Sequence, residues 1–373
     1  MTDEMPPPPA ALQRTHLHDW HVENGGRMVD FAGWELPVFY EAGALAEHHA
    51  TRDSVGLFDI DHMGQIQIAG DRALATVDRL VTSDMAGLAV GSARYGLLCN
   101  DDGGVIDDVI VYRLATADFL VVVNAANRSA DFEWMCSHGD DAEIIDRSDE
   151  LSMMAVQGPN AVALVDAAAG GGVAELERFT SSRIELFDTT AIVGRTGYTG
   201  EDGVELYVDG GVVDVWTGLL ETAAGHDIAA MAVGLSARDS LRFEPGYPLY
   251  GHELATDITP LEARLGWAVD FEGADFIGRD ALVAQKEAGI TRRLETIVLH
   301  DKGVPREGSP VLAEDGAELG MVVSGMFAPT ADVFAANVFL PRTHGAVGTP
   351  VVVDVRGRHK AASVAQRPLY RAD

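Results

Sequence analysis

The pattern of hydrophobic residues changes near Asp275, and this change divides the chain into two regions. Before it, segments with helical spacing alternate with segments that have the spacing of strands. After it, short β-rich runs are separated by glycine and proline turns, at residues 295–299, 319–324, 333–340 and 351–355. This pattern predicts an α+β region followed by a small C-terminal β-barrel or sandwich.

The first region contains a compact unit that the spacing predicts as strand, helix, three strands and helix. A turn at residues 100–104, NDDGG, joins two of its strands, because Asn, Asp and Gly tolerate positive φ. The predicted elements of this unit lie at residues 64–68, 71–82, 95–99, 105–114, 118–123 and 128–138. Further helices are predicted at residues 41–55 and 212–224, and further strands at 153–157 and 190–195.

The composition restricts the cellular compartment and the classes of binding partner that we expect. The net charge is −31, and the acidic residues are spread along the whole chain. We therefore expect a protein adapted to high salt, which screens such self-repulsion; an acidic surface for binding a partner is the alternative. Nucleic acid is not expected as a partner, since its phosphates need a basic face. Two cysteines, no apolar membrane span and no signal sequence predict a cytoplasmic protein.

Several motifs for common chemistries are absent from the sequence. There is no GxxxxGK[ST] or GxGxxG for nucleotides, no HExxH or CxxC for zinc, and no GxSxG for a nucleophilic serine. We therefore expect no metal site.

Asp107 and Asp108 are adjacent acids inside a strand that is otherwise apolar. Side chains alternate along a strand, so one acid faces the packed side or a cleft and the other faces away. A carboxylate facing inward needs hydrogen-bond donors or a ligand, because its desolvation is costly. The alternative is a pair of acids at a solvent-exposed strand edge.

Four other residues form a candidate site for a planar, polar heterocycle. Glu205, in a predicted strand, is suited to accept two N–H donors from such a ring. Arg238 lies on a helical segment together with Arg242 and Asp239, where the alternative is a solvated, self-paired surface. Tyr198 and Trp267 flank glycines and are able to stack on a ring, or to pack in the core.

Eight sequence blocks resemble, in order, the T-protein family of the glycine cleavage system. Each is weak alone, but eight in order are highly specific, and the resemblance runs from about Gly26 to Pro368, nearly the whole chain. The blocks are residues 26–38, 55–60, 62–64, 103–108, 121–127, 155–159, 197–205 and 237–242.

The resemblance implies a cloverleaf of three domains around a central folate channel. The first α+β domain would be split between residues 1–53 and 139–273, and the second would cover residues 54–138. A C-terminal β-barrel-like domain would cover residues 274–373. The proline run at residues 6–9 is expected to be an extended tail.

The resemblance also implies an activity and a set of site residues. The enzyme would move the methylene of the aminomethyl-lipoyl arm of H-protein to tetrahydrofolate, giving 5,10-methylenetetrahydrofolate and ammonia. Asp107, the first acid of the pair, matches the catalytic aspartate, and Glu205 and Arg238 match the positions that hold folate. Arg238 would either contact folate or orient Asp107. Other pocket residues would be Tyr95, Tyr198, Asn124 and Trp267.

Two departures from the family pattern leave alternatives open. Asp61 precedes His62 and Met63, where the family commonly has serine, and this places an extra negative charge near a cleft segment. The −31 charge also leaves little basic surface for an acidic H-protein. A tetrahydrofolate-dependent demethylase of a small methylated amine or sulfonium compound is therefore an alternative, as is a non-catalytic folate-binding module.

Overall fold

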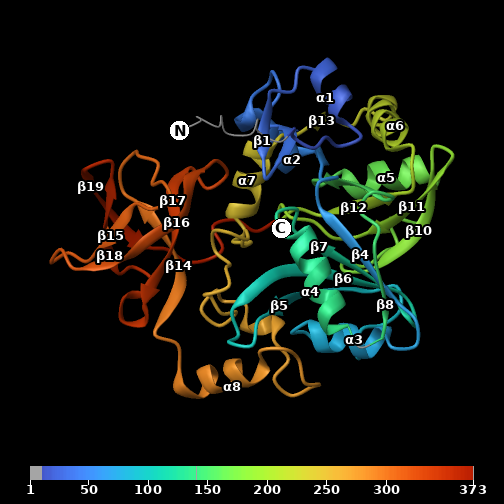
Figure 1. The fold of residues 1–373 in the computed structure, drawn as a ribbon. Helices are drawn as coiled ribbons and strands as arrows, with labels where there is room; N and C mark the ends of the chain where they lie inside the picture. The colour runs from blue at the N-terminus through green and yellow to red at the C-terminus, as the bar shows by residue number, and fades with distance from the viewer. Residues whose placement is uncertain (1–10, 140, 373) are drawn as a thin grey trace, which may run out of the picture.

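The computed structural model describes residues 11–139 and 141–372; the proline run at residues 6–9 lies outside the described residues. Two β-sheets stand beside a closed β-barrel, and helices cover the outer faces of the sheets (Figure 1). Within the described part of the chain, no helix has the length and apolar character needed to cross a membrane.

The larger sheet has six strands that come from widely separated parts of the sequence. In spatial order they are β10 (Ser181–Leu186), β11 (Thr189–Gly194), β12 (Gly203–Val208), β9 (Ser152–Gln157), β3 (Val55–Asp59) and β13 (Ala230–Ala232). Neighbours are antiparallel, except that β13 runs parallel to β3.

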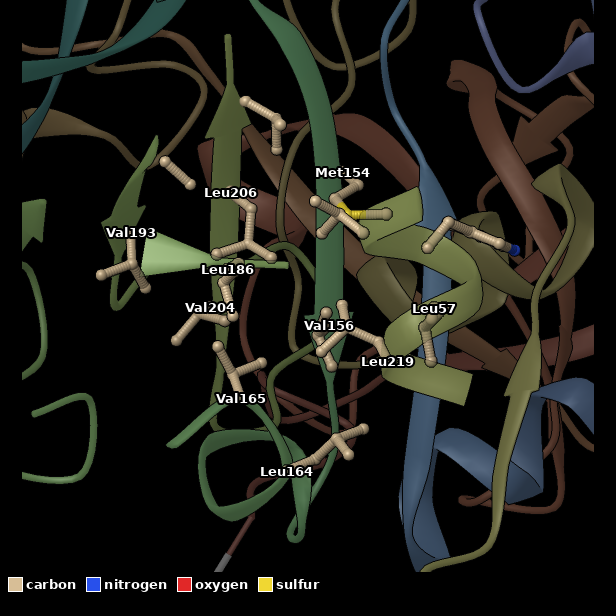
Figure 2. Packing of buried hydrophobic residues seen from close by; sticks show 14 of the residues in the cluster. Leu57, Met154, Val156, Leu164, Val165, Leu186, Val193, Val204, Leu206 and Leu219 are labelled. Carbon is tan, nitrogen blue, oxygen red and sulfur yellow. The ribbon is translucent and has the colours of Figure 1, made fainter. Parts of the chain in front are cut away.

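Two helices, α5 (Ala161–Ala169) and α6 (Val212–Gly225), cover one face of this sheet. Their apolar side chains meet those of the strands in a buried cluster that includes Leu57, Val156 and Leu219 (Figure 2). Burial of each such side chain contributes roughly 1.5–3 kcal/mol. The cluster therefore fixes the register of β12, which carries Glu205.

The smaller sheet has five antiparallel strands. In spatial order they are β5 (Ala93–Cys99), β6 (Val105–Ala115), β7 (Asp118–Val123), β4 (Gly64–Ala69) and β8 (Glu143–Asp146). Helices α3 (Ala73–Leu80) and α4 (Arg128–His138) pack on one face, through a cluster that includes Val109 and Val111 of β6.

The two sheets pack against each other through their remaining faces. Phe58 and Tyr207 of the larger sheet share a buried cluster with Tyr112 and Val122 of the smaller one. Helix α7 (Leu235–Phe243) contributes Leu241 to the same cluster. The arrangement therefore runs helices, sheet, sheet, helices.

The smaller N-terminal elements complete the first part of the chain. They are α1 (His18–Glu23), the paired strands β1 (Met28–Phe31) and β2 (Trp34–Pro37), and α2 (Ala44–Asp53).

The C-terminal region is a closed barrel with an apolar interior. Its strands, in order around the barrel, are β14 (Arg292–Leu299), β17 (Val333–Pro341), β16 (Glu318–Ala328), β15 (Pro310–Leu312), β18 (Pro350–Val355) and β19 (Arg358–Val364). Helix α8 (Arg279–Ala288) precedes the barrel and buries Leu282 against β5. The short helix η1 (Gly266–Ala268) lies in the connecting segment.

The predicted mixed α and β architecture with a C-terminal barrel is confirmed. The domain limits remain predictions. At two places, strands pair across these predicted limits. β3 falls within residues 54–138, yet it pairs with β9 of the larger sheet, while β8 falls outside that range and pairs with β4. Helix α8 was not predicted, because only Leu282 of its residues is buried and the apolar periodicity is therefore weak.

Candidate functional site

A cavity of about 560 Å³ lies at the meeting point of the two sheets, the segment after α7 and the C-terminal end of the chain. It lies within the size range of small-molecule sites. Six of the seven residues predicted for the site line this cavity: Tyr95, Asn124, Tyr198, Glu205, Arg238 and Trp267. The seventh, Asp107, is absent from the lining.

Asp107 and Asp108 face opposite sides of β6. Asp107 is fully buried and, like Val109 and Val111, lies on the side covered by α4. Asp108 lies on the other side and lines the cavity together with Ile110. Asp107, predicted as the catalytic acid, therefore does not line the cavity, and that prediction remains untested. Strand alternation brings Asp108 to the cavity.

Asp108 is held in place by two polar neighbours. The hydroxyl of Tyr95 donates to its Oδ2 at 3.0 Å, and the amide nitrogen of Asn124 donates to its Oδ1 at 2.9 Å. Burial, followed by the nearby charge of Asp107, raises the pKa of Asp108 to about 7. A carboxyl group with this pKa exchanges protons near neutral pH, which is the property of a general acid or base.

Two aromatic rings form one wall beside Asp108. Tyr95 and Trp267 stack with their ring centroids 5.4 Å apart and their planes at 27°. Trp267 is 71% exposed, so its ring is available at the rim of the cavity. An exposed, stacked tryptophan is suited to cover a flat ligand.

Glu205 lies on β12, where it is paired with Gly194 of β11. Its Oε2 accepts hydrogen bonds from Thr196 at 2.6 Å and from the Tyr112 hydroxyl at 3.4 Å. A Cβ atom at Gly194 would lie 2.5 Å from the Tyr112 hydroxyl oxygen, so glycine is required for this approach. Burial raises the pKa of Glu205, although the bond from Thr196 opposes the shift. Among the described residues, no hydrogen bond reaches Oε1, which leaves one carboxylate oxygen for a ligand.

Arg238 and Tyr198 lie next to each other in the cavity wall. The Arg238 guanidinium lies 4.8 Å from the centre of the Tyr198 ring. Arg242 forms ion pairs with Asp239 and Glu253, whereas in the described part of the chain no carboxylate pairs with Arg238. Ion pairing within the protein, the alternative that the sequence left open for Arg238, therefore applies to Arg242. Nor does any hydrogen bond between described residues join Arg238 to Asp107, so its guanidinium is placed to meet a ligand.

Sequence reasoning missed three arginines at another part of the cavity: Arg264, Arg367 and Arg371. Burial, followed by repulsion from Arg264, lowers the pKa of Arg367 to about 10. Arg367 and Arg371 carried no sequence signal, because they follow the last strand of the barrel and reach the cavity only through the fold.

The structure corrects the expectation for Asp61. Its carboxylate is 5% exposed and does not line the cavity. It accepts hydrogen bonds from the backbone N–H of Met153 at 2.9 Å and from the ring of His16 at 2.8 Å. Its neighbours Ile60 and Met63 reach the cavity, but Asp61 turns away to satisfy these donors, so it adds no charge to the site.

The site therefore combines flat aromatic walls with separated polar groups. Glu205 offers an acceptor, Arg238 a fixed positive charge, and Asp108 a carboxyl group that titrates near neutral pH. This arrangement fits a planar heterocycle whose N–H edge meets a carboxylate, together with a reacting atom beside Asp108.

The chain is similar to known proteins along most of its length. Residues 17–273 match the family described as the GCVT N-terminal domain, and residues 292–371 match the glycine cleavage T-protein C-terminal barrel domain. An aminomethyltransferase of Symbiobacterium thermophilum is 44% identical, covering 97% of this chain and 98% of that protein. One of Bdellovibrio bacteriovorus is 42% identical, covering 96% and 99%.

A solved structure is similar over nearly the whole fold. The glycine cleavage system aminomethyltransferase T from Bartonella henselae superimposes with a TM-score of 0.89 at 34% identity, covering 96% of this chain and 98% of that one. The chain belongs to the glycine cleavage T-protein family.

Proposed function

We propose that this protein is the aminomethyltransferase of a glycine cleavage system. It transfers the methylene of the aminomethyl-lipoyl group of H-protein to tetrahydrofolate, and yields 5,10-methylenetetrahydrofolate and ammonia. Relatives over 40% identical along nearly their whole length are named aminomethyltransferases, which supports this activity. The observation that carries the proposal is Asp108, a carboxyl group with a pKa of about 7 in a cavity lined by aromatic and polar groups.

The residues of the cavity fit a reduced folate. Tetrahydrofolate, when bound, supplies the two ring-closing nitrogens that take up the one-carbon unit. Glu205, with one carboxylate oxygen unclaimed by the described residues, is suited to the N–H edge of the pterin ring. Tyr95 and Trp267 are suited to the flat part of the molecule, and Arg238 adds a donor beside Tyr198.

Asp108 performs two tasks in the proposed reaction. Its carboxylate stabilises the positive charge that develops on the transferred methylene, because a fixed negative charge in a water-poor site acts strongly. Its pKa of about 7 also allows it to accept or release a proton, which contributes roughly 10²–10⁴-fold in rate. Tyr95 and Asn124 hold the carboxylate in one orientation, so little reorganisation is needed.

Replacement of each aspartate of the pair tests this assignment. We expect Asp108→Asn to lower kcat by roughly 10²–10³-fold, while the Kd for tetrahydrofolate changes less than about threefold, since the charge acts mainly in the transition state. The matched variant Asp107→Asn should keep more activity, because Asp107 does not reach the cavity. The measurement is ammonia release from aminomethyl-lipoyl H-protein. Full turnover by Asp108→Asn would remove the role given to Asp108.

A basic hollow on the surface supports docking of an acidic H-protein. It is lined by Lys286 and Arg342, and by Arg264 and Arg293, which share the carboxylate of Glu295, in a chain whose net charge is −31. Arg264 also lines the cavity, and the exposed Trp267 lies three residues further along the chain. A partner bound at the hollow would therefore stand beside the entrance and reach Asp108 with a flexible arm.

Charge reversal at the hollow tests the partner. We expect the double variant Lys286→Glu/Arg342→Glu to raise the KM for H-protein by roughly tenfold, because complementary charges mainly set association. The KM for tetrahydrofolate should not change. Lys302→Glu/Arg306→Glu is the matched control, since these exposed residues lie outside the hollow and change the net charge equally. Equal effects of the two double variants would speak against docking at the hollow.

The demethylase alternative has lost its motivating observation. Asp61 was expected to charge the cleft, but its carboxylate is occupied by Met153 and His16 outside the cavity. Turnover of a free methylated amine without H-protein would still favour that activity. The alternative of a non-catalytic folate-binding module is opposed by Asp108, since binding alone needs no acid with a pKa near 7. A cytoplasmic location and a salt-rich host stay predictions.

A further inference from the structure

A third aspartate lies behind the two on β6. Asp131, in the first turn of α4, is fully buried. Among the described residues, no hydrogen-bond donor reaches either of its carboxyl oxygens. Arg128, the nearest cation along the same helix, points to Asp146 and Asp149 at 3.1 and 2.9 Å instead. A buried carboxylate without any donor is costly, so its protonation state needs an explanation.

The neighbour of Asp131 is Asp107, and the two carboxyl groups interact both by charge and as hydrogen-bond partners. Asp107 accepts three hydrogen bonds at 2.8 Å, from the backbone N–H and side-chain amide of Asn124 and from the side-chain amide of Asn127. Burial raises the pKa of Asp107, but hydrogen bonds from Asp131, Asn124 and Asn127 oppose this shift and favour its ionised form. Asp131 has no such donors, so of the two it is the one suited to carry a proton.

A single proton between these two groups resolves the conflict. Two carboxylates in contact inside a protein cannot both ionise without a large repulsion. Burial, followed by the charge of Asp107, raises the pKa of Asp131 to about 10. The dipole of α4 favours a negative charge at its first turn, but burial outweighs it.

The pair is connected to the cavity through one side chain. The amide nitrogen of Asn124 donates both to Asp107, at 2.8 Å, and to Asp108, at 2.9 Å. We propose that Asp131 is a positioning residue that stays protonated and donates to Asp107, so that Asp107 remains ionised and holds Asn124 against Asp108. This inference rests on the role proposed for Asp108.

The groups whose charges act on Asp107, Asp108 and Asp131 come from several elements. Asp107 and Asp108 on β6 are the charges that act on Asp131. Tyr95 on β5 and the charge of Asp107 act on Asp108. Tyr250, in the segment after α7, is influenced by Asp107 and Asp131, and burial raises its pKa, so it remains neutral near pH 7. A change of charge at Asp131 would therefore act on Asp107 and on Asp108.

Infrared spectroscopy tests the protonation without reference to activity. At about pH 9, where Asp108 is ionised and Asp131 keeps its proton, the wild-type protein should show a carbonyl band of a buried, protonated carboxylic acid that is lost in Asp131→Asn. The exposed Asp102→Asn is the control and should keep the band. Loss of the band in Asp131→Asn would support this inference whatever the activity of the protein. Absence of aminomethyl transfer by the wild type would separately reject the proposed function. Identical spectra of wild type and Asp131→Asn would overturn the inference.

Kinetics test the positioning role. Asparagine is neutral and donates a hydrogen bond, so Asp131→Asn should retain kcat within about twofold and leave the pH profile of kcat unchanged. Asp131→Ala removes the donor and should lower kcat by roughly tenfold with little change in the KM for tetrahydrofolate. If Asp131 were ionised instead, Asp131→Asn would remove a negative charge near Asp108. The acid limb of the profile would then move to lower pH by about one unit, and this shift would overturn the inference.

Discussion

The opposite orientations of Asp107 and Asp108 decide what each carboxylate is able to do. Asp107 is enclosed by amide donors and has no route to a ligand, so its charge acts only through neighbours. Asp108 feels that charge, which together with burial brings its pKa to about 7. Replacing Asp107 by Asn should therefore lower the pKa of Asp108. If Asp108 acts in its ionised form, the acid limb of the pH profile of kcat should then move to lower pH.

Glu205 gives a second prediction for a single residue. We expect Glu205→Gln to weaken tetrahydrofolate binding by roughly 10–100-fold, because hydrogen bonds to a charged group contribute about 1.5–3 kcal/mol. The Kd is measured by calorimetric titration. Thr196→Val, which removes the 2.6 Å bond that orients Glu205, should have a smaller effect of the same sign. An unchanged Kd in Glu205→Gln would show that the ring binds elsewhere in the cavity.

The aspartate pair shows a limit of strand patterns. Both faces of β6 are apolar, with Ile110 on one side and Val109 and Val111 on the other. Alternation therefore indicates that the two aspartates lie on opposite faces of the strand, but not which of them lines a cavity. Residues such as Glu205 and Arg238 were found from their chemistry, yet only the fold brings their distant segments together.

At the scale of elements, prediction succeeded where the apolar pattern was strong. β7 and α4 have the expected limits, because one carries a continuous apolar run and the other begins after a turn and ends at Gly139. β10 and β8 were missed, since they are edge strands with few buried residues. An edge strand pairs on one side only and needs little apolar surface, so its sequence carries little signal.

A buried carboxylate connects three elements of the fold. Glu244, directly after α7, accepts hydrogen bonds from Arg52 of α2 at 2.9 Å and from the backbone N–H of Thr330 in the barrel at 2.7 Å. Burial alone would raise its pKa, but hydrogen bonds from His48 and Arg52 lower it to about 2. Because the folded-state pKa is lowered, the stabilisation by Glu244 is present above its ordinary pKa of about 4.5 and is lost as the pH falls toward 2.

Substitution of Glu244 tests this connection. We expect Glu244→Gln to lower the free energy of unfolding by roughly 1.5–3 kcal/mol at neutral pH, because Arg52 loses one of its two buried carboxylate partners and keeps Glu201. The difference from wild type should shrink once the pH falls below about 4.5. Urea titrations at several pH values measure both effects, and the exposed Glu314→Gln is the control. A difference that does not depend on pH would contradict the ionic explanation.

At the scale of the whole molecule, the three parts carry a large excess of negative charge. The chain has 58 acidic and 27 basic residues, and several arginines among these are engaged in buried or half-buried pairs such as Arg52–Glu201 and Arg242–Glu253. Many acidic side chains therefore face solvent without a cation. Their mutual repulsion is present in the folded protein and is relieved when the chain expands, so it lowers stability in dilute buffer.

Salt should therefore stabilise this protein. The screening length falls from roughly 10 Å at 0.1 M salt to about 3 Å at 1 M, which is shorter than typical distances between surface charges. We expect the melting temperature to rise by roughly 5 °C or more between 0.1 and 1 M KCl. NaCl should act equally, because screening depends on ionic strength, while sucrose at equal osmolality controls for exclusion of solutes from the surface. A melting temperature that depends on osmolality and not on ionic strength would show that repulsion within the acidic surface does not limit stability. That result would contradict the inferred adaptation to salt.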